Sequence, residues 1–229
     1  MSNQDRLIVA ISRQVGSGGA YVGQAVARRL GIRYVDRQML QEAARLLGVD
    51  EREVETLEDR APSLWDRVGR AFSRGAPDSL YVPPPMPVLD QTEVAQTESR
   101  LILDVAGRED VVIVGRAASW VLRDRPGLVS VFLHAPEQWR IQRMMRTYRI
   151  ADVRAAEDLV RRTDRGREAY LASITGGKWT DFLLRFQVSL DTAATGLDLV
   201  VEIIETLARS RRAALDALAQ TSPPPPGRV

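Results

Sequence analysis

The 229-residue chain contains no cysteine, one histidine (His134) and one lysine (Lys178). Without cysteine it forms neither disulfides nor thiolate metal sites, and one histidine cannot build a histidine metal cluster. No apolar run approaches the roughly 18 residues of a membrane-spanning helix. Residues 1–5 lack the charged-then-apolar layout of a signal peptide. We therefore expect a cytoplasmic protein with no membrane partner.

Arginine supplies nearly all of the positive charge. The net charge of +2 is too small to indicate a nucleic-acid partner, but the charge is unevenly distributed. Between Arg140 and Arg167, nine arginines stand against four acidic residues. Such a stretch is typical of a solvated helix face or of a phosphate site, because the guanidinium fork pairs two phosphate oxygens at once. The oligomeric state is not indicated by the sequence.

Five short apolar runs alternate with helical patterns. The runs are 7–11, 32–36, 111–114, 129–133 and 186–190. The first two, joined by a helical segment, form a strand–helix–strand unit of about 30 residues, which favours a parallel sheet covered by helices. We therefore predict an α/β fold with a parallel sheet of about five strands flanked by helices. A closing helix is expected over 199–218, with a break at Ser210.

A glycine-rich turn follows the first strand and leads into a helical pattern. Such a turn directs consecutive backbone amides, and the positive end of the helix dipole, at a phosphate. Glycine is needed there because a Cβ would block close approach and because some positions require a positive φ. The residues expected to bind the phosphates of a nucleotide are Gly16, Ser17, Gly18, Gly19, Ala20 and Tyr21.

The turn departs from the standard phosphate-loop pattern G-x-x-x-x-G-K-(S/T), whose lysine contacts the β- and γ-phosphates and whose hydroxyl binds Mg²⁺. With Gly18 as the second glycine, Arg13 replaces the first glycine. Gly19 then stands at the lysine and Ala20 at the hydroxyl. By motif alone, phosphate binding and a tight structural turn both remain open.

A dinucleotide-binding turn, G-x-G-x-x-G, is the other alternative. Gly16 and Gly18 fit its first two glycines, and Asp36 lies at the spacing of the acidic residue that binds the ribose. Its third small residue would be Tyr21, which is too bulky for close packing of a helix on a strand. The dinucleotide interpretation is therefore less favoured than a nucleotide phosphate loop.

Residues 11–19, Ile-Ser-Arg-Gln-Val-Gly-Ser-Gly-Gly, resemble the S-R-(E/Q)-(F/Y)-G-S-G-G signature of the cytidylate kinase-like proteins. These are a branch of the nucleoside monophosphate kinases with an altered phosphate loop, within the P-loop NTPases. Four later segments resemble the same family in the same order: 112–116, 131–143, 162–167 and 189–192. The resemblance covers about residues 6–207, and 55–91 match poorly.

The resemblance implies ATP-dependent phosphoryl transfer to a nucleoside monophosphate, with a CMP-like acceptor, Mg²⁺ and a closing lid. It also implies a single kinase-like domain over 1–221, with an inserted acceptor lobe at about 37–100 and an arginine-rich lid at about 150–180. The proline-rich residues 222–229 are expected to be a disordered tail.

By the same resemblance, Arg162, Arg165 and Arg167 are expected to form the lid clamp on the transferring phosphoryl group, where a cation is worth about 10³–10⁵ in rate. A solvated helix face is the alternative. Either Arg13 or Lys178 is expected to supply the charge of the missing lysine. Ser12 or Ser17 is a candidate for the missing magnesium-bound hydroxyl.

Arg116 follows a strand end, at the edge where ligands bind in α/β sheets, and by the resemblance it is expected to contact the phosphate or the base of the acceptor. Asp36 ends a strand at the same edge and is expected to hydrogen-bond the acceptor or to orient Mg²⁺. Lys178 is a further candidate for substrate binding. A structural salt bridge for Arg116 and a helix N-cap for Asp36 are the alternatives. After Asp36 the chain has Arg37-Gln38-Met39 instead of the Ser-Gly of cytidylate kinases, and Ala117 replaces an aspartate. The identity of the acceptor base therefore does not follow from the resemblance.

Two further functions remain open at this point. The absent lysine motivates a regulatory module that binds a nucleotide without turnover. The spacing of Gly16, Gly18 and Asp36 motivates a dinucleotide-dependent enzyme.

Overall fold

The structure is a computed structural model that describes residues 5–40, 91–175 and 185–221. Most of the expected acceptor lobe and the end of the expected lid lie outside these residues. Lys178 and the expected tail at 222–229 lie outside them as well. The single-domain division proposed from the sequence is therefore described only in part.

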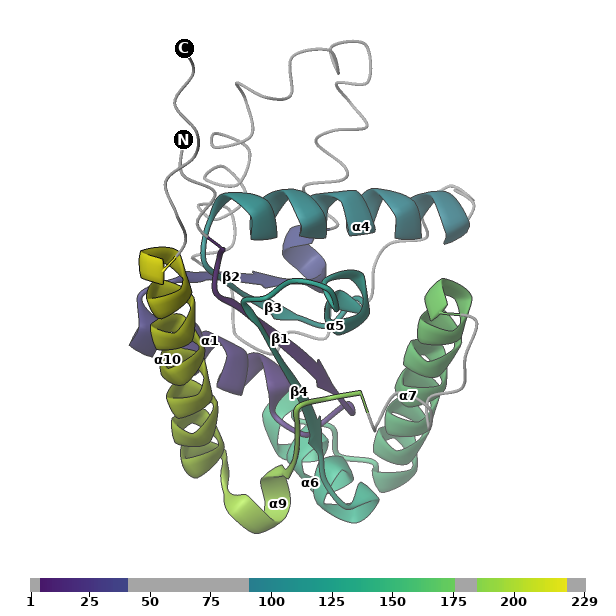
Figure 1. Ribbon diagram of the computed structural model, residues 1–229. Coiled ribbons are helices and arrows are strands. Elements are labelled where there is room, and N and C mark those ends of the chain that lie inside the picture. Colours follow the sequence, from purple (N-terminus) through teal and green to yellow (C-terminus); the bar gives the residue numbers. More distant parts are fainter. Residues whose placement is uncertain (1–4, 41–90, 176–184, 222–229) are drawn as a thin grey trace, which may run out of the picture.

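Five parallel strands form one sheet in the order β2-β3-β1-β4-β5 (Figure 1). They are β1 (Ile8–Arg13), β2 (Arg33–Asp36), β3 (Val111–Val114), β4 (Leu128–His134) and β5 (Val188–Asp191). Ile8 is in register with both Val111 and Leu128, so the central strands begin at the same level, and β1 and β4 extend beyond the end of β3. The predicted P-loop NTPase-like sheet of about five parallel strands is confirmed, and all five strands end at the same edge.

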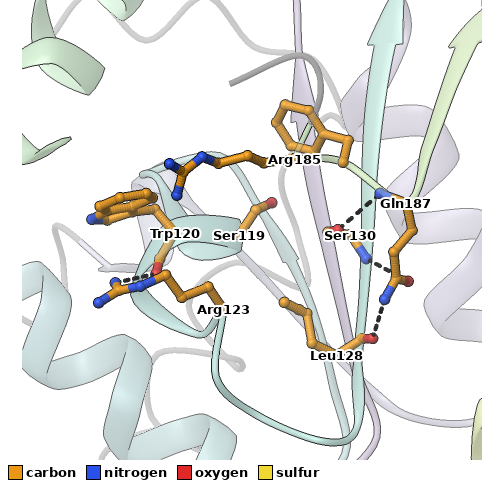
Figure 2. Close-up of a pocket in the computed structure, with 8 residues that line it drawn as sticks. Ser119, Trp120, Arg123, Leu128, Ser130, Arg185 and Gln187 are labelled. Carbon is orange, nitrogen blue, oxygen red and sulfur yellow. Dashed lines mark hydrogen bonds between the residues drawn. The ribbon is translucent and has the colours of Figure 1, made fainter. Parts of the chain in front are cut away.

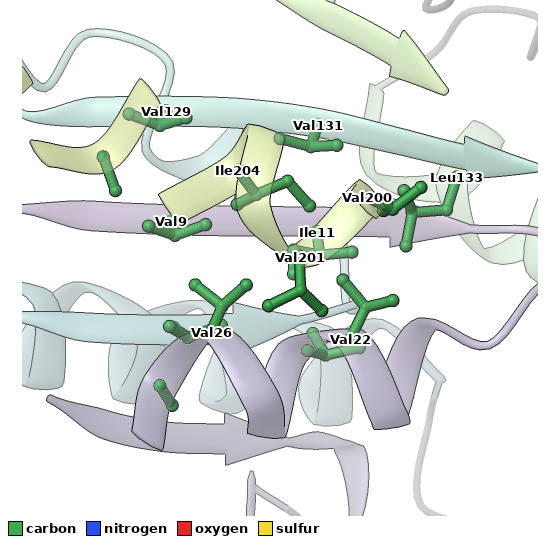
Figure 3. Packing of buried hydrophobic residues seen from close by; sticks show 14 of the residues in the cluster. Val9, Ile11, Val22, Val26, Val129, Val131, Leu133, Val200, Val201 and Ile204 are labelled. Atoms are coloured by element: carbon green, nitrogen blue, oxygen red, sulfur yellow. The ribbon is translucent and has the colours of Figure 1, made fainter. Parts of the chain in front are cut away.

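Helices cover both faces of the sheet, which explains why the central strands β1, β3 and β4 are mostly apolar. Alternate residues of β1 point to opposite faces. Val9 and Ile11 pack against α1 (Gly19–Leu30) and α10 (Leu197–Thr221), as Figure 3 shows around Val22 and Ile204.

The opposite face packs against α4 (Gln91–Arg108) and α5 (Ala118–Val121). There Ile8 and Ala10 belong to a cluster that includes Ile102 and Val105 of α4. α4 follows the undescribed residues 41–90. Its packing against β1 therefore joins the described residues on both sides of this gap.

The described residues also include α6 (Glu137–Tyr148), α7 (Val153–Thr175) and α9 (Thr192–Thr195), and the start of a helix at 37–40. α6 and α7 share a small apolar cluster that includes Ile141, Met144, Ala156 and Val160. α7 is thereby held beside the carboxyl ends of the strands.

The closing helix differs from its prediction. α10 runs without interruption from Leu197 to Thr221, so the break expected at Ser210 is wrong. Buried Ala208 and Leu215 continue its apolar face on both sides of Ser210, and a serine inside a helix costs only a few tenths of a kcal/mol. Among the described helices, none is both long and apolar enough to cross a membrane.

Candidate functional site

The glycine turn lies between the end of β1 and the start of α1, at the carboxyl edge of the sheet (Figure 1). Gly18 is the N-cap of α1, with φ 86°, and the first turn of the helix carries no acidic side chain. A glycine cap has no side chain to accept a hydrogen bond from the first amides. These amides and the positive helix end therefore favour an anion.

Two glycines of the turn have no room for a side chain. Gly16 has φ 79°, and a Cβ there would lie 2.8 Å from the backbone oxygen of Arg140. A Cβ on Gly18 would lie 2.6 Å from Cδ2 of Leu197. The turn is thus fixed by close contact with α6 and α10.

Ser17 holds the turn to the sheet. Its side chain is fully buried, and its hydroxyl donates to the backbone oxygens of Gln14, at 2.9 Å, and Leu133, at 3.3 Å. The hydroxyl therefore points into the protein and does not face the start of α1. Ser12, the other candidate hydroxyl, lies 3.5 Å from the hydroxyl oxygen of Ser119.

An ion pair between buried Arg140 and partly exposed Asp164 anchors the turn to α6 and α7. Oδ1 of Asp164 accepts the Val15 N–H at 2.8 Å, and Oδ2 accepts from Nη1 of Arg140 at 2.6 Å. The same Nη1 donates to the Val15 oxygen at 3.1 Å, and Nε of Arg140 donates to the Ala135 oxygen at 3.0 Å. Only 6% of the Arg140 side chain is exposed. Sequence reasoning missed this anchor because it joins residues far apart in the chain.

Replacing Asp164 with alanine is expected to lower the free energy of unfolding by about 3 kcal/mol, because it leaves Arg140 buried without its counter-charge. Urea denaturation measures the loss. Asp158→Ala, at an exposed position of the same helix, is the matched control. Equal stability of the two variants would contradict this assignment.

Arg13 and Arg167 meet beside the turn. Nη1 of Arg167 donates to the backbone oxygen of Arg13 at 3.2 Å. The Arg13 side chain passes α1 and the end of β3, since Cβ atoms on Gly19 and Gly115 would contact its Cγ and Nη1. Burial, and then the charge of Arg13, lowers the pKa of Arg167 to about 9, so Arg167 remains charged at neutral pH.

Arg116 follows β3 and is the next cation along the edge. Its Nη2 lies 3.1 Å from Oε1 of Glu98 on α4, and its guanidinium carbon lies 4.7 Å from the ring centre of Tyr170 on α7. Tyr170 donates its hydroxyl hydrogen to Oε2 of Glu98 at 2.8 Å. Arg116 therefore forms a salt bridge, which was the structural alternative for this residue. The salt bridge lies at the carboxyl edge of the sheet, where Arg116 was predicted.

Arg37 completes a cluster of four guanidinium groups, which we call the arginine cluster: Arg13, Arg37, Arg116 and Arg167. Burial, followed by the charge of Arg116, lowers the pKa of Arg37, although the residue as a whole is exposed. Arg13 lowers it further, and Glu98 raises it. Arginines that disfavour one another's charge in this way are stabilised by a bound anion.

Asp36, Ala20 and Tyr21 are the remaining predicted residues near this edge, and each lies at the start of a helix. Oδ1 of Asp36 accepts the N–H groups of Gln38 and Met39 at 3.0 and 3.1 Å, and its Oδ2 accepts from the Tyr34 hydroxyl. Asp36 is therefore the N-cap of the helix that begins at Arg37. Ala20 and Tyr21 lie in the first turn of α1.

The three predicted lid arginines do not share one face of α7. Arg167 lies on the face that carries buried Val160 and Leu171, whereas Arg162 and Arg165 are exposed. Arg162 donates to the backbone oxygen of its own helix at Asp158. In this conformation Arg167 alone of the three joins the arginine cluster.

A hollow of about 140 Å³ beside α5 is not part of this site (Figure 2). Leu128 and Ser130, which line it, lie in the first half of β4, away from the carboxyl edge. Gln187 uses its carboxamide on the backbone of these two residues. Arg123 stacks on Trp120 at 4.4 Å and donates to its backbone oxygen. These contacts are structural.

No group of three or more potential metal-ligating side chains gathers within the described part of the chain. Since Ser17 is turned inward and Asp36 caps a helix, none of the described residues is assigned to Mg²⁺. Mg²⁺ bound to a nucleotide keeps several waters and contacts mainly phosphates, so such a complex needs few protein ligands.

The chain matches the cytidylate kinase-like family over residues 8–193 and therefore belongs to this family. No protein of curated function matches it significantly. An uncharacterized protein from Eubacterium ventriosum has 20% identity and a TM-score of 0.64, over 90% of this chain and 99% of that chain. Shikimate kinase from Acinetobacter baumannii, in complex with shikimate, has 16% identity and a TM-score of 0.48, over 91% and 96%. A gluconokinase from Sinorhizobium meliloti has 20% identity and a TM-score of 0.41, over 96% of each.

The resemblance derived from the sequence is thus confirmed, and so is the fold. Family membership supports phosphoryl transfer and nucleotide binding in general. It does not specify the acceptor.

Proposed function

We propose that the protein transfers the γ-phosphoryl group of ATP to a nucleoside monophosphate, with a CMP-like acceptor. One observation carries this proposal: the arginine cluster lies beside the glycine turn, at the same edge of the sheet. Phosphoryl transfer between two nucleotides needs two phosphate sites placed in line, and it needs positive charge between them.

In this proposal the backbone amides of residues 16–21 bind the β- and γ-phosphates of ATP. Arg13 lies along Gly19, where a standard phosphate loop has its lysine, and it supplies the missing charge. Arg167 pairs with the transferring phosphoryl group. Mg²⁺ bound to the nucleotide adds further charge neutralisation.

Arg116 and Arg37 hold the acceptor phosphate. Glu98 supplies one negative charge for these two cations, and a phosphate monoester adds about two more at neutral pH, whereas a neutral hydroxyl acceptor adds none. Arg162 and Arg165 join the clamp only if α7 moves over bound ATP, which is the lid movement proposed from the sequence. The proposal therefore favours acceptors that already carry a phosphate.

The direct test measures ADP release with ATP, Mg²⁺ and a panel of nucleoside monophosphates, with cytidine as the acceptor that lacks a phosphate. We expect turnover with CMP or a related monophosphate and none with cytidine. Binding without turnover across the panel would favour the regulatory module motivated by the absent lysine. Thermal stabilisation by NAD but not by ATP would favour a dinucleotide-dependent enzyme.

A further inference from the structure

Glu98 is an acidic side chain that pairs with Arg116 of the arginine cluster, and it is only 1% exposed. Burial raises its pKa, while the charges of Arg116 and Arg37 and the hydrogen bond from Tyr170 oppose that rise. A buried carboxylate costs several kcal/mol of desolvation, and apolar residues often replace such pairs without loss of stability. Stability alone therefore does not explain a glutamate at this position.

The contacts of Glu98 join three separate elements. Glu98 lies on α4, and its Oε1 faces Arg116 at the end of β3. Its Oε2 accepts a hydrogen bond from the hydroxyl of Tyr170 on α7. Within the described part of the chain, Nε of Arg116 and Oε1 of Glu98 are both buried without a hydrogen-bond partner, so the contact between these two side chains is an ion pair. The protein thus holds Arg116 by charge and by ring stacking, and it leaves a donor of that side chain unused.

We propose that Glu98 and Tyr170 are positioning residues that hold the guanidinium of Arg116 for the phosphate of the acceptor, an inference that rests on the proposed function. A free arginine side chain carries about 2 kcal/mol of rotamer entropy, which a ligand would otherwise have to overcome. Glu98 fixes one edge of the guanidinium and Tyr170 covers one face. The remaining donors are thereby preorganised for an anion.

The effect is confined to the acceptor. Glu98 forms an ion pair with Arg116 and accepts a hydrogen bond from Tyr170. The turn at 14–18 is anchored separately, through Asp164 and Ser17. Loss of Glu98 therefore weakens acceptor binding and leaves ATP binding intact.

The experiment compares Glu98→Gln and Tyr170→Phe with the wild-type protein. Glu98→Gln removes the charge that faces Arg116, and Tyr170→Phe removes the hydrogen bond to Glu98. We therefore expect KM for the monophosphate to rise about tenfold, with KM for ATP and kcat changed less than threefold. Asp104→Asn is the matched control, because Asp104 lies on the same helix and pairs with Arg108 at 2.7 Å near the surface. It is expected to leave all three constants unchanged.

The pH profile separates positioning from a merely structural role. Protonation removes the charge that holds Arg116, so kcat/KM for the acceptor falls as the pH decreases through the pKa of Glu98. This fall in kcat/KM is expected at a higher pH than for an ordinary glutamate. Burial raises the pKa of Glu98, although Arg116, Arg37 and Tyr170 oppose that rise. The Glu98→Gln variant is expected to lack this fall in kcat/KM, and to keep the pH dependence that comes from titration of the acceptor phosphate.

A double-mutant cycle with Arg116→Lys tests whether Glu98 acts on the acceptor through Arg116. If Glu98 acts through Arg116, adding Glu98→Gln to Arg116→Lys raises KM for the acceptor no further. Unchanged acceptor KM in both Glu98→Gln and Tyr170→Phe, with active wild-type protein, would overturn this inference alone. If the wild-type protein neither binds nor phosphorylates any monophosphate, the proposed function fails and the inference fails with it. Should Glu98→Gln not fold, Tyr170→Phe decides.

Discussion

Replacing Arg167 with alanine is expected to lower kcat for phosphoryl transfer by about 10³-fold, the effect of removing a cation that stabilises the transferring phosphoryl group. Arg167 lies on the inward face of α7 and donates to the backbone of Arg13, beside the glycine turn. Its pKa is lowered to about 9 by burial and by neighbouring arginines. A cation withdrawn from water in this way interacts more strongly with a ligand charge than an exposed one does.

Two further variants make the Arg167 prediction specific. Arg167→Lys keeps the charge and loses the planar fork, so we expect it to recover only part of the rate. Arg154→Ala removes an exposed arginine of the same helix and is expected to leave kcat unchanged. Steady-state kinetics at saturating ATP and acceptor measure all three. A kcat of Arg167→Ala within tenfold of the wild-type value would contradict the role of Arg167.

Gly16→Ala is the second substitution with a large expected effect. A residue other than glycine pays about 1–2 kcal/mol in the left-handed conformation at φ 79°, and the new Cβ would also lie 2.8 Å from the backbone oxygen of Arg140. Since a backbone oxygen cannot move aside as a flexible side chain can, the turn itself must shift. A displacement of about 1 Å costs roughly 100-fold, so we expect at least that loss in kcat/KM for ATP.

Gly31→Ala is the control for this prediction, because Gly31 also has a positive φ, of 67°, but has open space where its Cβ would lie. It pays the conformational cost at the end of α1, far from the amides of the turn. We expect a lower melting temperature in both variants and impaired ATP binding only in Gly16→Ala. ATP affinity measured by calorimetry distinguishes them, and equal affinities would refute the role given to the turn.

The fold was predictable because its signals are local. The central strands β1, β3 and β4 are mostly apolar runs, as strands buried on both faces require, whereas the edge strands β2 and β5 also carry polar residues. Gly31 ends α1 in the left-handed conformation, as a glycine after a helical pattern indicates. The interruption expected at Ser210 failed because burial on one face of α10 outweighs the weak helix propensity of serine.

The site was predictable only where a motif marks it. The glycine turn and Arg116 follow strands directly, so their place at the carboxyl edge follows from the topology. Arg140 and Asp164 were missed as an anchor because their contacts span α6, α7 and the turn. Glu98 and Arg37 carry no motif, and only the packing of distant elements brings them to Arg116.

The sequence carries one further signal, which marks the inward face of α7. Ala156, Val160 and Leu171 recur at helical spacing, and this spacing places Asp164 and Arg167 on the same inward face of α7. Periodicity therefore separates Arg167 from the exposed Arg162 and Arg165, although the three are close in sequence.

A crystal structure with a bisubstrate analogue, adenosine and cytidine joined through five phosphates, tests the central claim most directly. We expect phosphates against the backbone amides of residues 16–21 and, at the cytidine end, against the guanidinium groups of Arg116 and Arg37, with Arg167 between the two. Phosphates bound away from the glycine turn, or an arginine cluster that makes no phosphate contact, would contradict it.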